Sequence, residues 1–278
     1  MPELPEAEVA ACQLRSRIVG ASVKDCWVGR ADIVREGLST VGWYRGARIT
    51  AVERRGKSVV FSLSRGQETR YIVGELGMTG RFLFRTSGQR FPQHTHFTLY
   101  LDDGAEPEVR YWNPRRFGRI YLLDRQGLDR FIARRFGLDP LDMTKEEFVR
   151  LLHARRGRLK PLLMHQQVIA GIGNIYANEI LFRAGLHPYR PANRLRRPAA
   201  ERLYRTVREV LEEAIRYGGS SVRDFFAPDG TEGRYKQRHL VYGKEGQPCP
   251  NGCGRRIRRL RGERSSFYCP SCQRKNLS

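Results

Sequence analysis

The fold of the C-terminal part of this chain is decided by residues 249–272, CPNGCGRRIRRLRGERSSFYCPSC. Two cysteine pairs, Cys249 with Cys253 and Cys269 with Cys272, stand fifteen residues apart. Closely spaced thiolate pairs of this kind match a tetrahedral zinc site with four sulfur ligands. Two disulfides are the alternative, but they are disfavoured in a reducing compartment. We therefore expect one structural zinc ion (Zn), whose four positions are all filled by protein and which takes no part in catalysis.

The residues between the two cysteine pairs are strongly basic. They carry a single glutamate and six arginines, Arg255, Arg256, Arg258, Arg259, Arg261 and Arg264. A span of this length can form a β-hairpin, so we expect a zinc-stapled β-ribbon that presents cationic side chains to phosphates. A solvated charged surface without a partner is the alternative.

The chain as a whole is also basic. Over 278 residues, Lys and Arg outnumber Asp and Glu by 51 to 29, which gives a net charge of +22. Such an excess suits a long polyanion, and it favours nucleic acid over a membrane surface. No run of about 18 apolar residues is present, so we expect no membrane span. The N-terminal residues lack the basic and apolar regions of a signal peptide, and we expect a cytoplasmic, nucleoid-associated protein.

Apolar periodicity divides the rest of the chain into a β-rich half and a helical half. A first helix is expected from Pro5, which suits an initial helical turn, to Gly20. Short alternating segments with glycine-containing turns fill residues 22–124, and they predict a compact sandwich or barrel. Residues near 125–143 are expected to connect the halves. The helices expected in the second half span residues 144–153, 172–184 and 199–217.

Six motifs along the chain resemble those of formamidopyrimidine-DNA glycosylase and its sister endonuclease VIII. They are Pro2-Glu3-Leu4-Pro5-Glu6, Gly56-Lys57, Leu76-Gly77-Met78-Thr79-Gly80, Asn113-Pro114-Arg115-Arg116-Phe117-Gly118, Gly171-Ile172-Gly173-Asn174-Ile175-Tyr176 and Arg264-Ser265-Ser266-Phe267-Tyr268-Cys269-Pro270. Their joint order over nearly the whole chain argues against a chance match. Leu4 after Pro2-Glu3 resembles the formamidopyrimidine branch, which favours oxidised purines such as 8-oxoguanine and formamidopyrimidines.

The resemblance implies an α+β architecture of several domains. These are an N-terminal β-sandwich with a leading helix, a helical helix–two-turn–helix domain and a terminal zinc β-ribbon. The expected boundaries are residues 1–130 for the catalytic sandwich domain, 131–143 for a linker, 144–240 for the helical domain with its lesion loop, and 241–278 for the DNA-binding zinc ribbon. The implied partner is damaged double-stranded DNA, bound by a monomer and without a membrane.

The resemblance also implies that Pro2 is the nucleophile of a DNA base-excision repair reaction. A small residue after Met1 favours removal of the initiator methionine, which would expose Pro2 as a secondary amine. An α-amine has a lower pKa than lysine, so more of it is neutral and nucleophilic near pH 7. Attack on the sugar C1′ would release the base, and the resulting Schiff base would promote β- and then δ-elimination. A simple helix-leading proline is the alternative interpretation of Pro2.

Three more residues acquire catalytic roles from the same resemblance. Glu3 is the expected general acid and base at the sugar ring. Glu6 is expected to orient the N-terminus, and the alternative is an acid that only complements the helix dipole. Lys57 is expected to hold a phosphate beside the damaged base and to assist catalysis.

Four residues are candidates for the phosphate-binding surface, and a fifth is a DNA-binding candidate. Asn174 begins a helix after a Gly-x-Gly turn, and a helix N-terminus suits a phosphate. The resemblance implies that Arg264 in the ribbon completes a phosphate clamp. Lys160 and Tyr176 are weaker candidates for the same surface, and His96 is a further DNA-binding candidate.

An enzyme that flips a base out of the duplex must fill the gap. The resemblance assigns this task to Met78, Arg115 and Phe117, with Arg115 pairing with the orphaned base. Met78 and Phe117 could otherwise be core residues, but their glycine-rich flanks favour exposed loops. Residues 220–233 lie where the family closes over the flipped purine, which their backbone amides would read.

Four positions depart from the family's motifs. Glu75 stands where the family commonly has a phosphate-supporting histidine, and a carboxylate there would repel a phosphate. His165 and Asn113 each replace an aspartate, and the first zinc pair has three intervening residues instead of two. Glu75 and His165 put the rate, the pH dependence and the lesion preference in question.

Three functions are compatible with these observations. The first, which we expect, is a bifunctional glycosylase and abasic-site lyase. The second, motivated by Glu75 and His165, is a catalytically weak paralogue that binds damaged or abasic DNA. The third is a plain zinc-ribbon nucleic-acid-binding protein, and it leaves the N-terminal motif unexplained.

Overall fold

The computed structural model divides the chain into two compact units. One contains Met1–Arg135 and Ile215–Lys236, and the other contains Phe136–Ala214 and Gln237–Ser278. The residues that the structure describes are 2–85, 93–221, 225–262 and 264–275. The segment Ile215–Lys236 thus belongs with the N-terminal half, a grouping that the sequence did not indicate. The domain boundaries given above stay a prediction.

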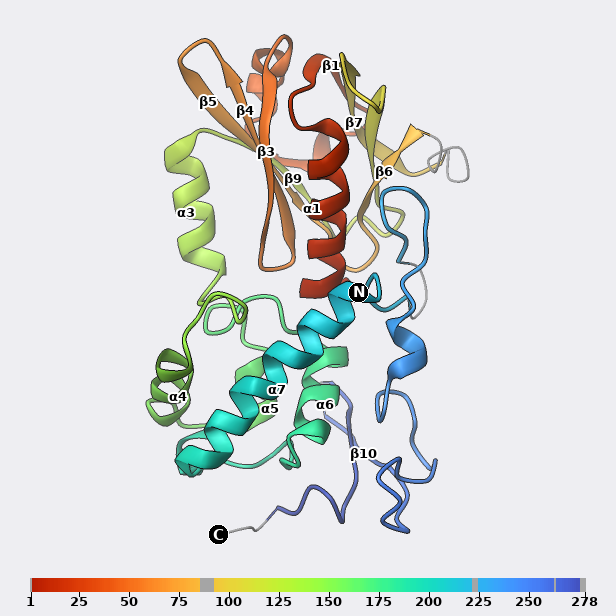
Figure 1. The fold of residues 1–278 in the computed structure, drawn as a ribbon. Helices are drawn as coiled ribbons and strands as arrows, with labels where there is room; N and C mark the ends of the chain where they lie inside the picture. The colour runs from red at the N-terminus through yellow and green to blue at the C-terminus, as the bar shows by residue number, and fades with distance from the viewer. Residues whose placement is uncertain (1, 86–92, 222–224, 263, 276–278) are drawn as a thin grey trace. The chain divides into compact units, whose positions relative to one another are not determined.

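A helix at the N-terminus, α1 (Leu4–Ile18), opens the first unit as expected. Pro5 lies in its first turn, and Gly20 follows its end in the left-handed region with φ 96°. Leu14 and Ile18 are fully buried on its inner face. This face packs against β3 (Arg48–Arg55) and β4 (Ser58–Arg65) (Figure 1).

Nine strands are described between residues 22 and 123, and hydrogen bonds join them in the order β2-β9-β5-β4-β3-β1-β7-β8-β6. Besides β3 and β4, they are β1 (Ser22–Val28), β2 (Val34–Glu36), β5 (Glu68–Glu75), β6 (Arg81–Phe84), β7 (Thr95–Asp102), β8 (Glu108–Trp112) and β9 (Ile120–Leu123). Neighbouring strands are antiparallel except β2 and β9. Short 3-10 turns, η1 (Ala31–Ile33) and η2 (Leu38–Tyr44), interrupt the run.

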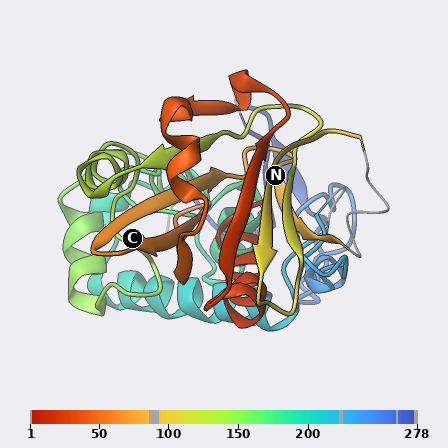
Figure 2. The same cartoon turned by 90° about the horizontal axis from the view of Figure 1, so that it is seen from above.

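These strands form a β-sandwich, one of the two outcomes that their alternation predicts. β1 and β3 share only the pair Ser22 and Arg48, so the sheet can fold over at that point. Phe82 on β6 then packs edge-on against Phe61 on β4, with ring centroids 5.0 Å apart. A Cβ at Gly74 on β5 would collide with the Phe82 ring. The two layers therefore pack around one apolar core. Figure 2 shows the strands of the first unit from above.

The expected connection near residues 125–143 contains a helix that the sequence did not predict, α3 (Arg125–Arg135). Its sequence carries only Leu128 and Phe131 as large buried apolar residues, which is a short signal among many arginines. The helix is started by the Asp124 carboxylate, which accepts the Gly127 N–H at 2.7 Å.

The second unit is helical, as the change of period indicates. Its helices are α4 (Lys145–His153), α5 (Leu159–Leu163), α6 (Asn174–Arg183) and α7 (Arg197–Arg216). The 3-10 turn η3 (Ala192–Arg194) lies between α6 and α7, and η4 (Tyr235–Arg238) follows α7. α7 and η4 each extend across the division between the units. Thr144 caps α4 through the expected capping box, because its hydroxyl accepts the Glu147 N–H at 3.2 Å. Every helix among the described residues is too short or too polar to span a bilayer.

The C-terminal ribbon packs on α6. Its strands β10 (Arg258–Leu260) and β11 (Ser266–Tyr268) are antiparallel. Glu179 of α6 is fully buried, and its carboxylate accepts the backbone N–H groups of Leu240, Val241 and Tyr242 at 2.8, 3.0 and 2.8 Å. A buried carboxylate with three charge-assisted hydrogen bonds fixes the chain that leads into the ribbon.

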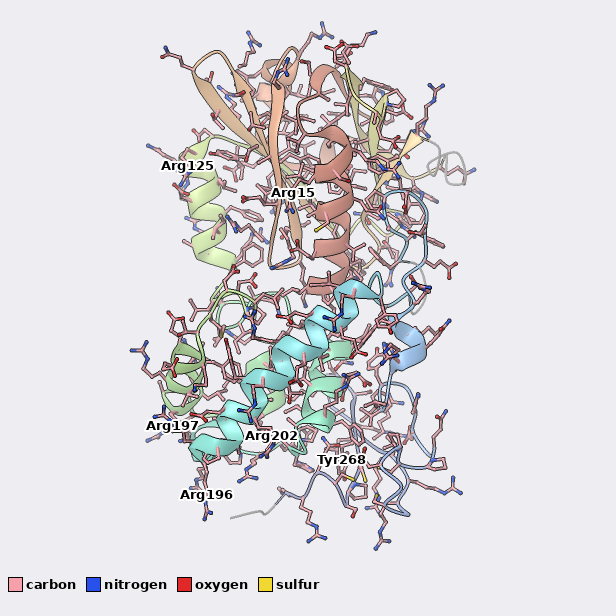
Figure 3. All side chains as sticks on the ribbon, in the orientation of Figure 1. Arg15, Arg125, Arg196, Arg197, Arg202 and Tyr268 are labelled. Carbon is pink, nitrogen blue, oxygen red and sulfur yellow. The ribbon has the colours of Figure 1, made fainter. Side chains whose placement is uncertain are left out.

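Arginine side chains decorate both units. Three of the exposed arginines are Arg125 on α3 and Arg196 and Arg197 at the start of α7. Their side chains point away from the backbone into solvent (Figure 3). The excess positive charge of the sequence therefore lies largely on the surface, where it acts on charged partners.

Candidate active site and nucleic-acid interface

The N-terminal motif lies at the buried start of α1. Pro2 is buried, and the side chains of Glu3 and Glu6 belong to residues only 2% and 1% exposed. One carboxylate oxygen of Glu6 accepts the Glu3 N–H at 2.7 Å, and the other accepts the Ser220 N–H at 2.7 Å. Glu6 therefore does more than complement the helix dipole, because it joins the N-terminus to the segment that begins at Ser220. Met1 lies outside the described residues.

Lys57 occupies the two-residue turn between β3 and β4. Gly56 before it has a φ of 58°, which a hairpin turn of this length needs and glycine adopts without strain. Next to the turn, the guanidinium of buried Arg54 forms an ion pair with Glu8 of α1 at 2.7 Å. This pair, which the sequence did not indicate, ties the Lys57 turn to the helix that begins after Pro2 and Glu3. Figure 1 shows the hairpin of β3 and β4 beside α1.

Two loops, residues 76–80 and 113–118, pack backbone against backbone. A Cβ at Gly77 would lie 2.5 Å from the Gly118 nitrogen. A Cβ at Gly118 would collide with the Tyr111 hydroxyl and the Glu75 carbonyl. Glycine is therefore required at both positions for the loops to approach each other this closely.

Asn113 holds these two loops together from the inside. Its side chain is fully buried, and the oxygen of its side-chain amide accepts a hydrogen bond from the Thr79 hydroxyl at 3.2 Å. Its amide nitrogen donates to the Tyr111 hydroxyl and the Gly118 carbonyl, both at 3.2 Å. An ionised aspartate has no donor for either contact. The departure from the family at this position thus has a structural role in this chain.

The three residues expected to fill the gap in the duplex project from these loops. Met78 is 41% exposed and Phe117 is 58% exposed, so neither is a core residue. Arg115 is also exposed, and its guanidinium stacks on the Phe117 ring at 5.1 Å from the centroid. The structure brings the three side chains to one pair of adjoining loops.

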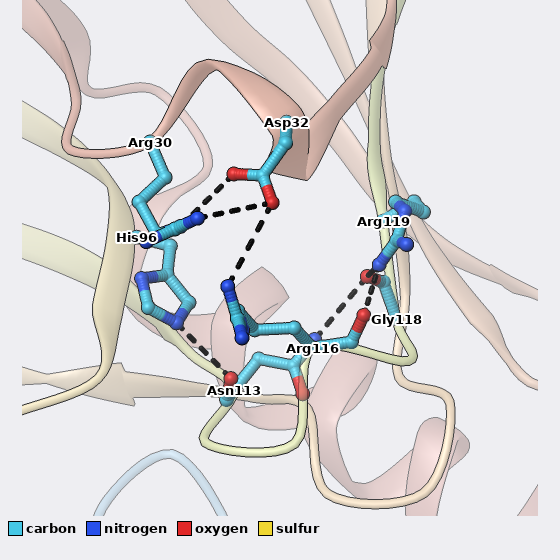
Figure 4. A network of polar contacts seen from close by, with 7 residues as sticks. All are labelled: Arg30, Asp32, His96, Asn113, Arg116, Gly118 and Arg119. Carbon is cyan, nitrogen blue, oxygen red and sulfur yellow. Dashed lines mark hydrogen bonds and ion pairs between the residues drawn. The ribbon is translucent and has the colours of Figure 1, made fainter.

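His96 lies beneath the second loop instead of on the surface. It is 7% exposed, and its Nε2 lies 3.1 Å from the Asn113 carbonyl oxygen (Figure 4). Burial lowers the pKa of His96, and although the hydrogen bond to the Asn113 carbonyl opposes this shift, nearby Arg30, His94 and Arg116 act in the same direction as burial. A neutral imidazole that donates to this carbonyl supports the loop, whereas a direct contact of its ring with DNA would require the ring to be more exposed.

Arg116 has a backbone that few residues with a side chain adopt, with a φ of 53°. Its guanidinium lies 3.9 Å from the Asp32 carboxylate of η1, which also binds Arg30 at 2.9 Å (Figure 4). Arg119 donates to the backbone carbonyls of Arg116 and Gly118. These contacts stabilise the strained turn that orients Arg115 and Phe117.

Glu75, the departure that would repel a phosphate, has its charge paired within the first unit. Its carboxylate binds Arg135 at 2.6 Å and accepts the Tyr121 hydroxyl at 2.9 Å. The Arg135 guanidinium also stacks on Tyr121 and Phe131, with distances of 5.2 and 4.7 Å to the ring centroids. Arg135 therefore compensates the negative charge of Glu75, a partner that the sequence alone did not reveal.

In the second unit, Asn174 is the first residue of α6, as the Gly-x-Gly turn predicts. The turn is held by Gln166, whose amide donates to the Ile172 carbonyl at 2.8 Å and accepts the Gly171 N–H at 2.9 Å. The sequence did not indicate this role of Gln166, because its side chain binds the backbone of Gly171 and Ile172, and no local pattern predicts such a contact. His165 before it is exposed, so its substitution leaves this contact intact.

Lys160 and Tyr176 are buried, with exposed fractions of 2% and 0%. The Lys160 ammonium donates to the Ser265 carbonyl at 2.6 Å and to the Ser266 hydroxyl at 2.9 Å. The adjoining Arg264 is exposed. Arg264 is therefore accessible to a phosphate, whereas Lys160 supports the ribbon from below and Tyr176 is buried within α6.

The four cysteines of the ribbon meet at one point. Their sulfur atoms all lie within 4.8 Å of one another, with Cys249 to Cys272 at 3.7 Å and Cys253 to Cys269 at 3.4 Å. Four thiolates at about 2.3 Å from a tetrahedral zinc ion stand roughly 3.8 Å apart, whereas a disulfide needs about 2.05 Å. The donor set fits one structural zinc ion and excludes the disulfide alternative.

Comparisons with known proteins agree with this geometry. Residues 1–120 match the formamidopyrimidine-DNA glycosylase N-terminal domain, and residues 136–226 match the formamidopyrimidine-DNA glycosylase H2TH domain. Formamidopyrimidine-DNA glycosylase of Thermus thermophilus is 40% identical over 98% of both chains. The protein of that name from Pelotomaculum thermopropionicum is 38% identical over 99% of both chains.

Solved structures give the same answer. The MutM (Fpg) protein of Thermus thermophilus superposes with a TM-score of 0.85 at 38% identity, covering 99% of this chain and 100% of that one. The Lactococcus lactis Fpg in complex with DNA that contains an abasic site gives 0.86 at 31% identity, covering 98% and 100%. With two domain models, full-length relatives and the whole fold in agreement, this chain belongs to the formamidopyrimidine-DNA glycosylase family.

Proposed function

We propose that this protein is a bifunctional DNA glycosylase and abasic-site lyase that removes oxidised purines with Pro2 as its nucleophile. The placement of Pro2 and Glu3 at the buried start of α1, with Glu6 bound to both Glu3 and Ser220, supports the proposal most directly. Family membership and the solved complex of Lactococcus lactis Fpg with Fapy-dG-containing DNA support the substrate class.

The reaction needs Met1 to be removed, because only then does Pro2 have a nitrogen lone pair for attack. The Pro2 nitrogen bonds to the sugar C1′ as the bond from C1′ to the base breaks, and the base leaves with a proton. Ring opening, in which O4′ takes up a proton, gives an iminium ion that withdraws electrons. A proton then leaves C2′ as the C3′–O bond breaks and the 3′ phosphate departs, and a proton leaves C4′ as the C5′–O bond breaks and the 5′ phosphate departs. Water finally hydrolyses the iminium and restores the Pro2 amine. Glu3 carries protons to and from the sugar during these steps.

Each unit contributes its own DNA contacts. In the first unit, Lys57 holds a phosphate near the reacting sugar, while Met78, Arg115 and Phe117 occupy the space that the flipped base leaves. In the second unit, Asn174 at the N-terminus of α6 and Arg264 of the ribbon bind phosphates. Lys160 supports the ribbon and His96 supports the loop from below, while Tyr176 is a buried residue of α6. Damaged duplex DNA is the partner of a cytoplasmic, monomeric protein.

The alternative of a catalytically weak DNA-binding paralogue loses its main motive in this structure. Glu75 is paired with Arg135, and the exposed His165 leaves the Gln166 contacts in place.

A duplex with 8-oxoguanine opposite cytosine tests the proposed function. We expect the strand to be cut on both sides of the lesion, with phosphates left at both ends of the gap, because β- and δ-elimination follow base release. The products are identified by denaturing electrophoresis beside authentic markers. Tight binding of the duplex without cleavage would contradict the proposal and favour the weak paralogue.

A further inference from the structure

Residues 225–233 are fastened to the β-sandwich by contacts that the proposed reaction does not use. Arg81 on β6 is 3% exposed, and its guanidinium lies between two aromatic rings. The Trp112 ring centroid is 4.2 Å away and the Phe226 ring centroid is 4.8 Å away. Arg81 therefore links a strand of the sandwich to Phe226 by stacking on both sides.

Helix α1 binds the same segment. The Gln13 amide nitrogen donates to the Asp229 carboxylate at 3.0 Å, and the Gln13 amide oxygen accepts the Asp229 N–H at 3.1 Å. The Phe84 N–H of β6 adds a hydrogen bond to the Pro228 carbonyl at 2.9 Å. A two-point contact of this kind fixes both the position and the orientation of the Asp229 turn.

The other described flank is fastened to α1 as well, through the hydrogen bond from Ser220 to Glu6. Residues 222–224, which lie between the flanks, are outside the described residues. Both flanks are thus held by the helix that begins immediately after Pro2 and Glu3. The described parts of this segment, residues 220–221 and 225–233, are therefore held by the sandwich and by α1, which also carries the proposed nucleophile at its start.

We propose that Arg81 and Gln13 are positioning residues that determine how well the enzyme excises a damaged base, as distinct from how well it cleaves an abasic site. This inference rests on the proposed function and on the family resemblance, which implies that backbone amides of the segment beginning at Ser220 contact the flipped base. An abasic site has no base to contact. Displacement of the Phe226 and Asp229 anchors should therefore slow base excision and spare the lyase steps.

The test compares two substrates under single-turnover conditions. One duplex carries 8-oxoguanine opposite cytosine, and the other carries a preformed abasic site at the same position. For Gln13→Ala and Arg81→Met we expect excision of 8-oxoguanine to fall by about tenfold and abasic-site cleavage to change by less than about twofold. Gln13 is half-buried, so Gln13→Ala decides the question if Arg81→Met does not fold.

Arg70→Met is the matched control. Arg70 also stacks on a tryptophan of the sandwich, Trp43, at 5.0 Å, but it makes this contact away from residues 225–233. Both activities should persist in this variant. Equal losses on the two substrates in Gln13→Ala, or no loss on 8-oxoguanine, would overturn the inference. A wild-type protein inactive on both substrates would instead overturn the proposed function, and the inference with it.

Discussion

Glu6 and Glu75 show how the surroundings of a single carboxylate decide what it does. Glu6 is almost fully buried, and each of its oxygens accepts a backbone N–H. Glu75 is paired with Arg135 and Tyr121. Motif and spacing predicted that Glu6 orients the N-terminus. They could not predict the partner of Glu75, because Arg135 lies sixty residues away and only the packing of α3 on β5 brings it close.

At the same scale, His96 should make stability depend on pH. Burial lowers the pKa of His96 in the folded state, so between this value and the ordinary value of about 6.5 the unfolded chain binds more protons. Its contribution to stability is therefore complete above about pH 6.5 and is lost as the pH falls through the folded pKa.

His96→Gln should consequently flatten the fall in the free energy of unfolding between about pH 7 and pH 5. Urea denaturation at several pH values measures this. His165→Gln, at an exposed position, is the control for the loss of one imidazole. If His96→Gln retained the wild-type pH profile, the supporting role of a neutral His96 would be wrong.

At the scale of elements, local sequence patterns predicted the features that depend on neighbouring residues, such as where helices begin and how they are capped. The start of α1, the capping box of α4 and the first residue of α6 all follow from neighbouring residues. Helix α3 escaped prediction because its apolar signal is short. The docking of residues 220–233 on α1 also escaped, since contacts such as Gln13 with Asp229 join residues 216 positions apart.

The close approach of residues 76–80 and 113–118 gives a prediction about glycine. Gly118→Ala should destabilise the fold by about 1–3 kcal/mol, because its Cβ would meet a backbone carbonyl and a buried hydroxyl that cannot move freely. It should also weaken DNA binding by displacing Arg115 and Phe117. Gly42→Ala is the control, since a Cβ there meets nothing within 4 Å. Chemical denaturation of both variants checks this, and equal stabilities would refute the required contact.

At the scale of the whole molecule, the composition of the chain predicted the kind of partner more directly than it predicted the architecture. A net charge of +22, carried largely by exposed arginines, indicates a polyanion. The zinc ribbon follows from cysteine spacing, since thiolate chemistry permits few alternatives. The grouping of Ile215–Lys236 with the first unit could not be predicted, because it depends on how distant segments pack.

Charge also predicts the salt dependence of binding. The logarithm of the association constant for duplex DNA should fall linearly with the logarithm of the salt concentration, as counterions are released from phosphates. Arg264→Ala should weaken binding to duplex DNA of any sequence. It should also reduce the magnitude of the salt-dependence slope by about 0.9, the contribution of one phosphate contact. Fluorescence anisotropy over a salt series measures both. An unchanged slope would remove Arg264 from the phosphate contacts.

The identity of the nucleophile is the central claim, and borohydride trapping tests it most directly. The processed protein is mixed with the 8-oxoguanine duplex and borohydride, and the covalent complex is digested and mapped by mass spectrometry. We predict that the DNA is attached to the nitrogen of Pro2 and that Pro2→Gly strongly impairs trapping. Attachment at Lys57, or full trapping and cleavage by Pro2→Gly, would contradict the account.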